Sequence, residues 1–160
     1  MEIDFKTAMV IAAHPDDSEF NCAGTVAQWV DQGVDVTYVV LSRGDKGSGD
    51  RLMTPELLAA MRESEQRAAA CYLGVKQVAF LDFRDGEIWD SPTARERVVR
   101  AIRTYRPEAV LTHDPATYYH GDLFLNHPDH KATGDIALAA IYPLARDHMH
   151  FPEHLAEGLE

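Results

Sequence analysis

The sequence contains few cysteines and few basic residues, and each shortage excludes a class of protein. Its 160 residues include two cysteines, Cys22 and Cys71, both in apolar, helix-like surroundings. Two thiols do not form a disulfide framework, so we predict that both are buried and free in a reducing compartment. Only 15 Lys and Arg residues oppose 26 Asp and Glu, giving a formal net charge of −11. We therefore expect neither a nucleic acid nor an anionic membrane as the main partner.

Long hydrophobic segments and nucleotide-binding motifs are also missing from the sequence. No apolar run approaches the roughly 20 residues that span a bilayer. Residues 1–4 have neither the basic nor the apolar part of a signal peptide. We expect a cytoplasmic protein without a membrane span. No Gly-x-Gly-x-x-Gly motif follows the first predicted strand and no Walker pattern occurs, which argues against a nucleotide-binding Rossmann domain.

Apolar and β-branched runs alternate with helix-like segments along the chain. We predict strands over residues 8–12, 34–41, 77–83 and 109–112, and helices over 19–32, 54–73, 91–105 and about 127–145. The remaining long segments are predicted to be an irregular loop, 116–126, and a polar tail, 148–160. This alternation favours an α/β fold: a Rossmann-like, doubly wound, mostly parallel sheet with helices on both faces and the strand order 3-2-1-4. We expect one domain over residues 1–160.

Residues 13–19 (Ala-His-Pro-Asp-Asp-Ser-Glu), which follow the first predicted strand, concentrate acidic groups around one imidazole. Pro15 fixes its own φ and disfavours helical geometry at His14, so the strand must end here and the acids fall on a loop. We expect Asp17 or Ser18 to cap the helix that follows. Taken alone, this stretch is also typical of an ordinary helix cap with an exposed histidine.

A second cluster, residues 127–130 (His-Pro-Asp-His), stands at the start of the last predicted helix. In the order 3-2-1-4, strands 1 and 4 are neighbours where the winding reverses, and ligands bind at the carboxyl ends of such strands. The two clusters follow strands 1 and 4, so the predicted fold brings them into one crevice although about 110 residues separate them. Taken alone, the second cluster is also typical of a capped helix with two exposed histidines.

Together the two clusters offer donors for a divalent cation. Nitrogen and carboxylate donors without thiolates suit zinc and other first-row divalent metals. Catalytic sites keep three protein ligands and one open position, and we choose His14, Asp17 and His130 as those ligands. Water on such an ion has a pKa of about 7. His113 and Asp114, at the end of the fourth predicted strand, compete as ligands.

The residues left over in both clusters suit catalysis. Asp16 lies beside a ligand without being needed as one, so it is the candidate general base. His127 is the remaining imidazole and can polarise a carbonyl oxygen or stabilise an oxyanion, and Asp129 can orient it through its second ring nitrogen. For Arg62 and Asp85, near the same end of the sheet, a surface salt bridge is the simpler role when each is taken alone. Four further histidines are expected in loops or on the surface: His120, His148, His150 and His154.

The two clusters resemble the signature of the PIG-L / LmbE-like N-acetylglucosaminyl deacetylases. That family has an Ala-His-Pro-Asp-Asp segment after its first strand and a His-x-Asp-His segment downstream, which here are residues 13–17 and 127–130. Weaker resemblance lies between them, at residues 43–47, 62–65, 73–75 and 85–86. The match extends over essentially the whole chain.

The resemblance implies a Rossmann-like fold and a zinc-dependent hydrolase. Its reaction would remove an acetyl or related acyl group from an N-acetylglucosamine-type conjugate. By position, the resemblance implies these roles: zinc ligands His14, Asp17 and His130; general base Asp16; electrostatic or acid partner His127, supported by Asp129; and sugar or aglycone contacts Arg62 and Asp85.

Relatives in this family usually continue past the point that corresponds to Glu160, so we expect the C-terminal part of the family fold to be missing. Two alternatives to the deacetylase stay open. One is a non-catalytic zinc- or sugar-binding module of the same fold, and the other is an amidase that acts on a different N-acyl conjugate. The expected partners are a small amino-sugar conjugate and, in a homo-oligomer, further copies of the chain.

Overall fold

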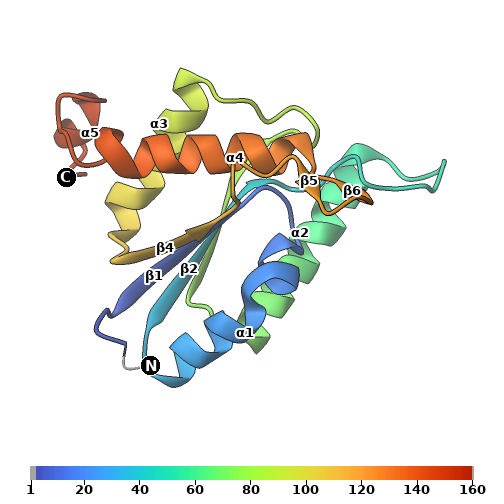
Figure 1. Cartoon of the computed structure of the whole chain (residues 1–160), viewed down its shortest axis with the longest axis horizontal. Coiled ribbons are helices and arrows are strands. Elements are labelled where there is room, and N and C mark those ends of the chain that lie inside the picture. Colours follow the sequence, from blue (N-terminus) through green and yellow to red (C-terminus); the bar gives the residue numbers. More distant parts are fainter. Residues whose placement is uncertain (1–2, 160) are drawn as a thin grey trace.

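The computed structural model describes residues 3–159 and is built around a four-stranded parallel sheet (Figure 1). Its strands are β1 (Thr7–Ala12), β2 (Asp35–Ser42), β3 (Gln77–Phe83) and β4 (Ala109–Thr112). They lie in the order β3-β2-β1-β4, which confirms the predicted topology. In the middle of the sheet, Val10 of β1 is in register with Tyr38 of β2 on one side and with Leu111 of β4 on the other.

Helices cover both faces of this sheet. They are α1 (Asp17–Asp31) and α2 (Pro55–Tyr72) on one face, and α3 (Pro92–Tyr105) and α4 (Pro128–Ala139) on the other (Figure 1). Successive side chains of a strand point to opposite faces. Val10 and Tyr38 therefore pack in the cluster that contains α1 and α2, while Met9 and Ile11 pack in the cluster that contains α3 and α4. Both faces of the strands are apolar, as a parallel sheet buried on both sides requires.

Local signals in the sequence fix where the helices begin and end. The side-chain hydroxyl of Thr54 accepts the N–H of Leu57 at the start of α2, and Ser91 does the same for Ala94 at the start of α3. A proline follows each cap, at the position where its missing N–H costs nothing. Gly74, just past the end of α2, has φ +76°, and a Cβ there would lie 2.8 Å from Val30 Cγ1, so only glycine fits.

Two segments differ from the sequence-based expectation. The stretch 116–126, expected to be irregular, contains an antiparallel hairpin of β5 (Tyr119–His120) and β6 (Phe124–Leu125). The last long helix, expected to run to about residue 145, ends as α4 at Ala139 and continues as a π-helical turn, η1 (Ala140–Leu144). Pro143 lies inside that turn, and proline has no N–H with which to extend a regular helix.

Two single-residue expectations are wrong. Cys71 is exposed, whereas Cys22 is half-buried; both thiols are free. Cys71 follows the buried Ala70 on α2, and one step along a helix turns the side chain by about 100°. His154, expected in a loop or on the surface, is fully buried in the short helix α5 (Glu153–Ala156).

A separate finding concerns membranes. Across the described part of the chain, the helices are too short or too polar to traverse a bilayer.

Candidate metal centre

The loop between β1 and α1 takes an unusual backbone shape. Asp16 is the N-cap of α1 with φ 84° and ψ −26°, in the left-handed region, and its side chain makes no cap hydrogen bond. The expectation that Asp17 or Ser18 caps the helix is therefore wrong, because the helix already begins at Asp17. A left-handed conformation costs an L-residue about 1–2 kcal/mol, so the surrounding contacts must hold Asp16 in place.

Three of the predicted residues converge at the carboxyl end of β1. One donor atom from each of His14, Asp17 and His130 lies within 4.8 Å of the other two. Asp17 Oδ1 lies 3.0 Å from His130 Nε2, and Asp17 Oδ2 lies 3.6 Å from His14 Nδ1. The backbone N–H of His14 also donates to Asp17 Oδ2 at 2.8 Å, which fixes the carboxylate. The fold thus joins the starts of α1 and α4, as the sequence predicted.

The other edge of the His14 ring faces two further carboxylates. Its Nε2 lies 3.0 Å from Asp129 Oδ2 and 3.2 Å from Asp85 Oδ1. Asp129 is 1% exposed and also accepts the N–H of Gly86 at 2.7 Å. A carboxylate on the far nitrogen of a ligating histidine fixes the ring and its tautomer. The Nδ1 edge of His14 is therefore available to bind an ion, while carboxylates hold the Nε2 edge.

Asp129 consequently has a different neighbour from the one expected. The sequence placed its carboxylate beside His127, but in the structure it lies on His14. His127 is the N-cap of α4, and its Nδ1 accepts the backbone N–H of Asp129 at 3.2 Å. At a helix start the cap side chain turns back toward the first-turn N–H groups, so the two residues meet through the backbone instead.

A second group of donors shares His14. One donor atom each from His14, Asp85 and His127 also lies within 4.8 Å of the others, and the His14 and His127 rings meet edge to face at 4.7 Å. Asp85 was expected as a sugar contact, and here its carboxylate faces the site from the loop after β3. His127 thus lies close to the proposed ligands, on the Asp85 side of His14.

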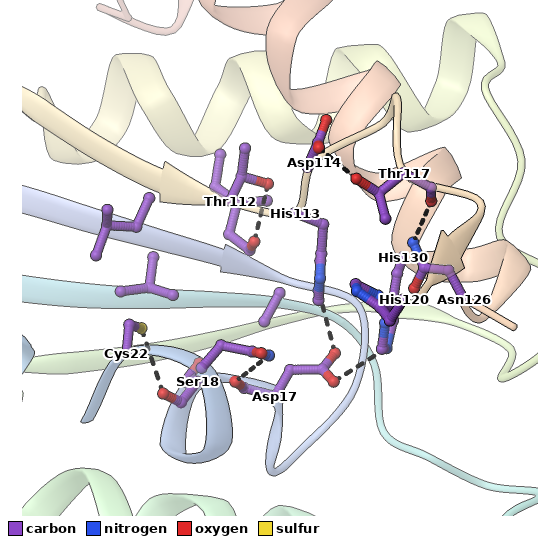
Figure 2. A pocket seen from close by; sticks show the side chains of 15 residues that line it. Asp17, Ser18, Cys22, Thr112, His113, Asp114, Thr117, His120, Asn126 and His130 are labelled. Atoms are coloured by element: carbon purple, nitrogen blue, oxygen red, sulfur yellow. Dashed lines mark hydrogen bonds and ion pairs between the residues drawn. The ribbon is translucent and has the colours of Figure 1, made fainter. Parts of the chain in front are cut away.

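His113, the competing ligand, lies beside His130 and also contacts Asp17. Figure 2 shows dashed lines from the Asp17 carboxylate to both His113 and His130. His113 Nε2 lies 3.3 Å from Asp17 Oδ2 and accepts the N–H of Ala13 at 3.2 Å, while its ring stacks on His130 at 4.2 Å. Neither of the two three-donor groups found within residues 3–159 includes His113. His113 therefore contacts two of the proposed ligands, Asp17 and His130, without belonging to either group.

The charges around His14 fit a divalent cation. Burial by itself lowers the pKa of His14, but hydrogen bonds to Asp129 and Asp17 and the nearby Asp85 overcome that effect and raise the pKa to about 9. Burial would raise the pKa of Asp17, yet His113, His130 and His14 hold it well below its usual range. The buried or half-buried carboxylates of Asp17, Asp85 and Asp129 surround one imidazole, and their negative charges have to be balanced by positive charge. A bound dication would supply that charge, and the nitrogen and oxygen donors suit zinc.

Asp16 stays outside both donor groups. Arg62 Nη2 donates to Asp16 Oδ2 at 2.8 Å and to the Pro15 carbonyl at 2.7 Å. Burial raises the pKa of Asp16, and the Arg62 guanidinium opposes that rise. The side chain of Arg62 packs against the loop that contains Gly44. A Cβ on Gly44 would lie 3.0 Å from Arg62 Cδ, and Gly44 has φ +67°, which favours glycine. Arg62, expected as a sugar contact, therefore holds the loop that carries Asp16.

A cavity of about 270 Å³ opens beside the donors (Figure 2). Its walls come from α1, β1, β4 and the segment that leads to α4. Asp17 and His130 are among the residues that line it. His120, expected merely in a loop, lines the cavity with Thr117 and Asn126. No signal in the sequence indicated this role, because the hairpin that positions His120 was not predicted.

The site and fold match a known family. The sequence model of the PIG-L family, described as GlcNAc-PI de-N-acetylase, matches residues 9–141. The chain belongs to the PIG-L family. This confirms the resemblance drawn from the two motifs, which bracket most of the matched range.

Individual PIG-L relatives agree with this assignment. Diacetylchitobiose deacetylase of Thermococcus kodakarensis is 36% identical over 138 residues, which cover 86% of this chain and 50% of that protein. The structure of N,N'-diacetylchitobiose deacetylase from Pyrococcus horikoshii aligns with a TM-score of 0.91 and 32% identity, covering 98% of this chain and 57% of that one.

A second structure belongs to a protein with another activity. GalB, the 4-carboxy-2-hydroxymuconate hydratase from Pseudomonas putida, aligns with a TM-score of 0.77 and 28% identity, covering 91% of this chain and 60% of that one. The chain spans about half the length of the curated relatives it matches. Fold and family are thus settled, whereas the reaction has to be argued from the site.

Proposed function

We propose that this chain carries the centre of a zinc-dependent hydrolase that removes an acetyl or related acyl group from an N-acetylglucosamine-type conjugate. One observation carries the proposal: donor atoms of His14, Asp17 and His130 lie within 4.8 Å of one another, while Asp16, which directly precedes Asp17, belongs to neither donor group. The family and the deacetylase relatives support the amide substrate. The hydratase relative has the same fold, so the fold alone does not choose the reaction.

The proposed roles follow from what each side chain faces. When bound, zinc supplies a Lewis acid that lowers the pKa of water to about 7 and polarises the acyl carbonyl. Asp16 takes the proton of the attacking water, and Arg62 keeps its carboxylate in one orientation. Asp129 and Asp85 hold the His14 ring on its far edge. Asp16 therefore moves a proton, Arg62 orients Asp16, and Asp129 and Asp85 orient His14.

His127 is the proposed partner of the carbonyl oxygen. Burial and the neighbouring charge on His14 lower the pKa of His127, so its imidazole is largely neutral at pH 7 in the ion-free protein. A neutral imidazole can donate one hydrogen bond to the developing oxyanion. The departing amine then takes a proton either from Asp16, which holds the one removed from the water, or from His127 in its protonated imidazolium form. Asp85 and Arg62 are the proposed contacts to the sugar or aglycone.

The test is amine release from a panel of N-acetylglucosaminides that includes N,N'-diacetylchitobiose, with zinc add-back. Asp16→Asn should lower kcat by about 100- to 10,000-fold, because it removes the proton acceptor. Bound zinc per chain should stay unchanged. The matched control is Asp4→Asn, an exposed aspartate at the opposite end of β1, which should behave as the parent. Unchanged amine release from Asp16→Asn would remove Asp16 as the base.

The same assay separates the two rival functions when N-acyl conjugates that lack glucosamine are added to the panel. A zinc- or sugar-binding module would bind zinc and a glucosaminide, measured by calorimetry, yet release no amine from any member. An amidase of different specificity would release amine only from N-acyl conjugates that lack glucosamine. The deacetylase proposal fails in both of these cases.

A further inference from the structure

Two side chains of α2, Gln66 and Arg62, contact the loop at the strained residue Asp16. Gln66 Oε1 accepts the Asp16 N–H at 2.9 Å. Arg62, one helical turn earlier, donates to the Pro15 carbonyl and to the Asp16 carboxylate. Residues four apart lie on the same face of a helix, so both side chains reach the loop and together make three hydrogen bonds to it. Gln66 is 2% exposed and belongs to none of the sequence motifs.

Gln66 is itself oriented by a carboxylate. Its Nε2 donates to Glu19 Oε1 at 2.9 Å, and Glu19 lies in the first turn of α1. An ionised carboxylate only accepts hydrogen bonds, so Glu19 selects the amide nitrogen of Gln66 and leaves the amide oxygen for Asp16. The side-chain amide of Gln66 is therefore fixed in one orientation, with its nitrogen toward Glu19 of α1 and its oxygen toward the Asp16 N–H.

We propose that Gln66, oriented by Glu19, is a positioning residue that keeps the carboxylate of Asp16 in its working place. This rests on the proposed function, in which Asp16 is the general base. Without an acceptor for its N–H, Asp16 loses the side-chain contact to its own backbone that favours φ 84°, a region that L-residues avoid. Relaxation of φ swings the carboxylate away. Asp17 keeps its place, because the His14 N–H and α1 hold it independently.

The test compares three variants with the parent in the zinc-loaded chain. Gln66→Met keeps the length and apolar contacts of the side chain but loses the acceptor, and kcat should fall about 10- to 100-fold with KM and bound zinc unchanged. Glu19→Gln is the matched control, since its amide oxygen still accepts from Gln66, and it should behave as the parent. The exchanged pair Glu19→Gln/Gln66→Glu should have a kcat close to that of the parent and well above that of Gln66→Met. In that pair the carboxylate moved to α2 accepts both the Asp16 N–H and the amide moved to α1.

A second readout does not depend on activity. Hydrogen exchange of the Asp16 amide, followed by NMR, should be slow in the parent and in Glu19→Gln, and faster in Gln66→Met. If the parent releases no amine but the exchange result holds, the proposed function fails and the clamp on the Asp16 backbone stands. The positioning role is overturned if Gln66→Met keeps full kcat. It is also overturned if Gln66→Met loses zinc in parallel, or if the exchanged pair recovers nothing.

Discussion

His14 is the residue at which both sides of the site meet. Its Nδ1 edge faces Asp17, and its Nε2 edge faces Asp129 and Asp85. The ring is nine-tenths covered, so it cannot rotate to exchange these neighbours without disturbing all of them. One imidazole therefore serves as a proposed ligand and as the link between the ligand set and the loop after β3.

The choice between His130 and His113 as ligand is testable. His130→Ala should lose stoichiometric zinc, because it removes one of the three donors that lie within 4.8 Å. His113→Ala removes only a neighbour of Asp17 and His130, and should weaken zinc affinity about 10- to 100-fold. The measurement is metal content after dialysis against graded chelator. Stoichiometric zinc in His130→Ala would assign the third ligand to His113 or His127.

At the scale of elements, α3 holds the C-terminal segment through one buried side chain. Arg103 is 3% exposed as a residue, and its guanidinium points across to the segment after α4. It donates to the Nδ1 of His154 and to five backbone carbonyls, those of Leu144, Ala145, Asp147, His150 and Phe151. His154 in turn contacts Glu96 of α3 through Nε2. These bonds replace the regular secondary structure that the segment largely lacks.

Arg103→Met should therefore lower the free energy of unfolding by about 3 kcal/mol or more, because several buried carbonyls and His154 lose their donor. Arg100→Met is the control on the same helix. Arg100 is partly exposed and pairs with Glu96 and Glu157, so its loss should cost less than about 1 kcal/mol. Urea denaturation of both variants measures the difference. Equal costs would mean that the buried guanidinium is not what holds the segment.

At the scale of the whole molecule, negative charge dominates. The formal net charge is −11, and Asp17, Asp85 and Asp129 surround a single histidine. In the ion-free protein a proton on His14 offsets part of this charge. The folded-state pKa of about 9 lies above the ordinary value of 6.5, so this stabilisation is complete below pH 6.5 and is lost as the pH rises through 9.

We therefore expect the ion-free chain to lose about 3 kcal/mol of unfolding free energy between pH 6 and pH 10 through this group alone. The zinc-loaded chain should not show this loss, because the ion takes the place of the proton. His14→Gln should flatten the difference in the ion-free form, and His148→Gln, an exposed control, should leave it unchanged. Chemical denaturation with and without chelator at both pH values is the measurement. An ion-free parent with equal stability at both would contradict the charge argument.

Patterns in the sequence were enough to predict the sheet and the meeting of the two clusters. The strands Gln77–Phe83 and Ala109–Thr112 begin and end where the apolar pattern places them. Local rules decided these features, because strand periodicity, prolines and caps depend on neighbours a few residues away. With parallel strands in the order 3-2-1-4, the ends of β1 and β4 had to be adjacent.

The contacts between individual side chains became visible only in the folded molecule. Asp129 turns to His14 across 115 residues, Gln66 reaches Asp16 across 50, and His154 is buried against α3 across 51 and 58. No local pattern encodes such pairs, because they depend on the register of distant elements and on which rotamer each side chain adopts there. A one-residue shift along a helix turns a side chain by about 100°, which is why Cys71 faces solvent while Ala70 is buried.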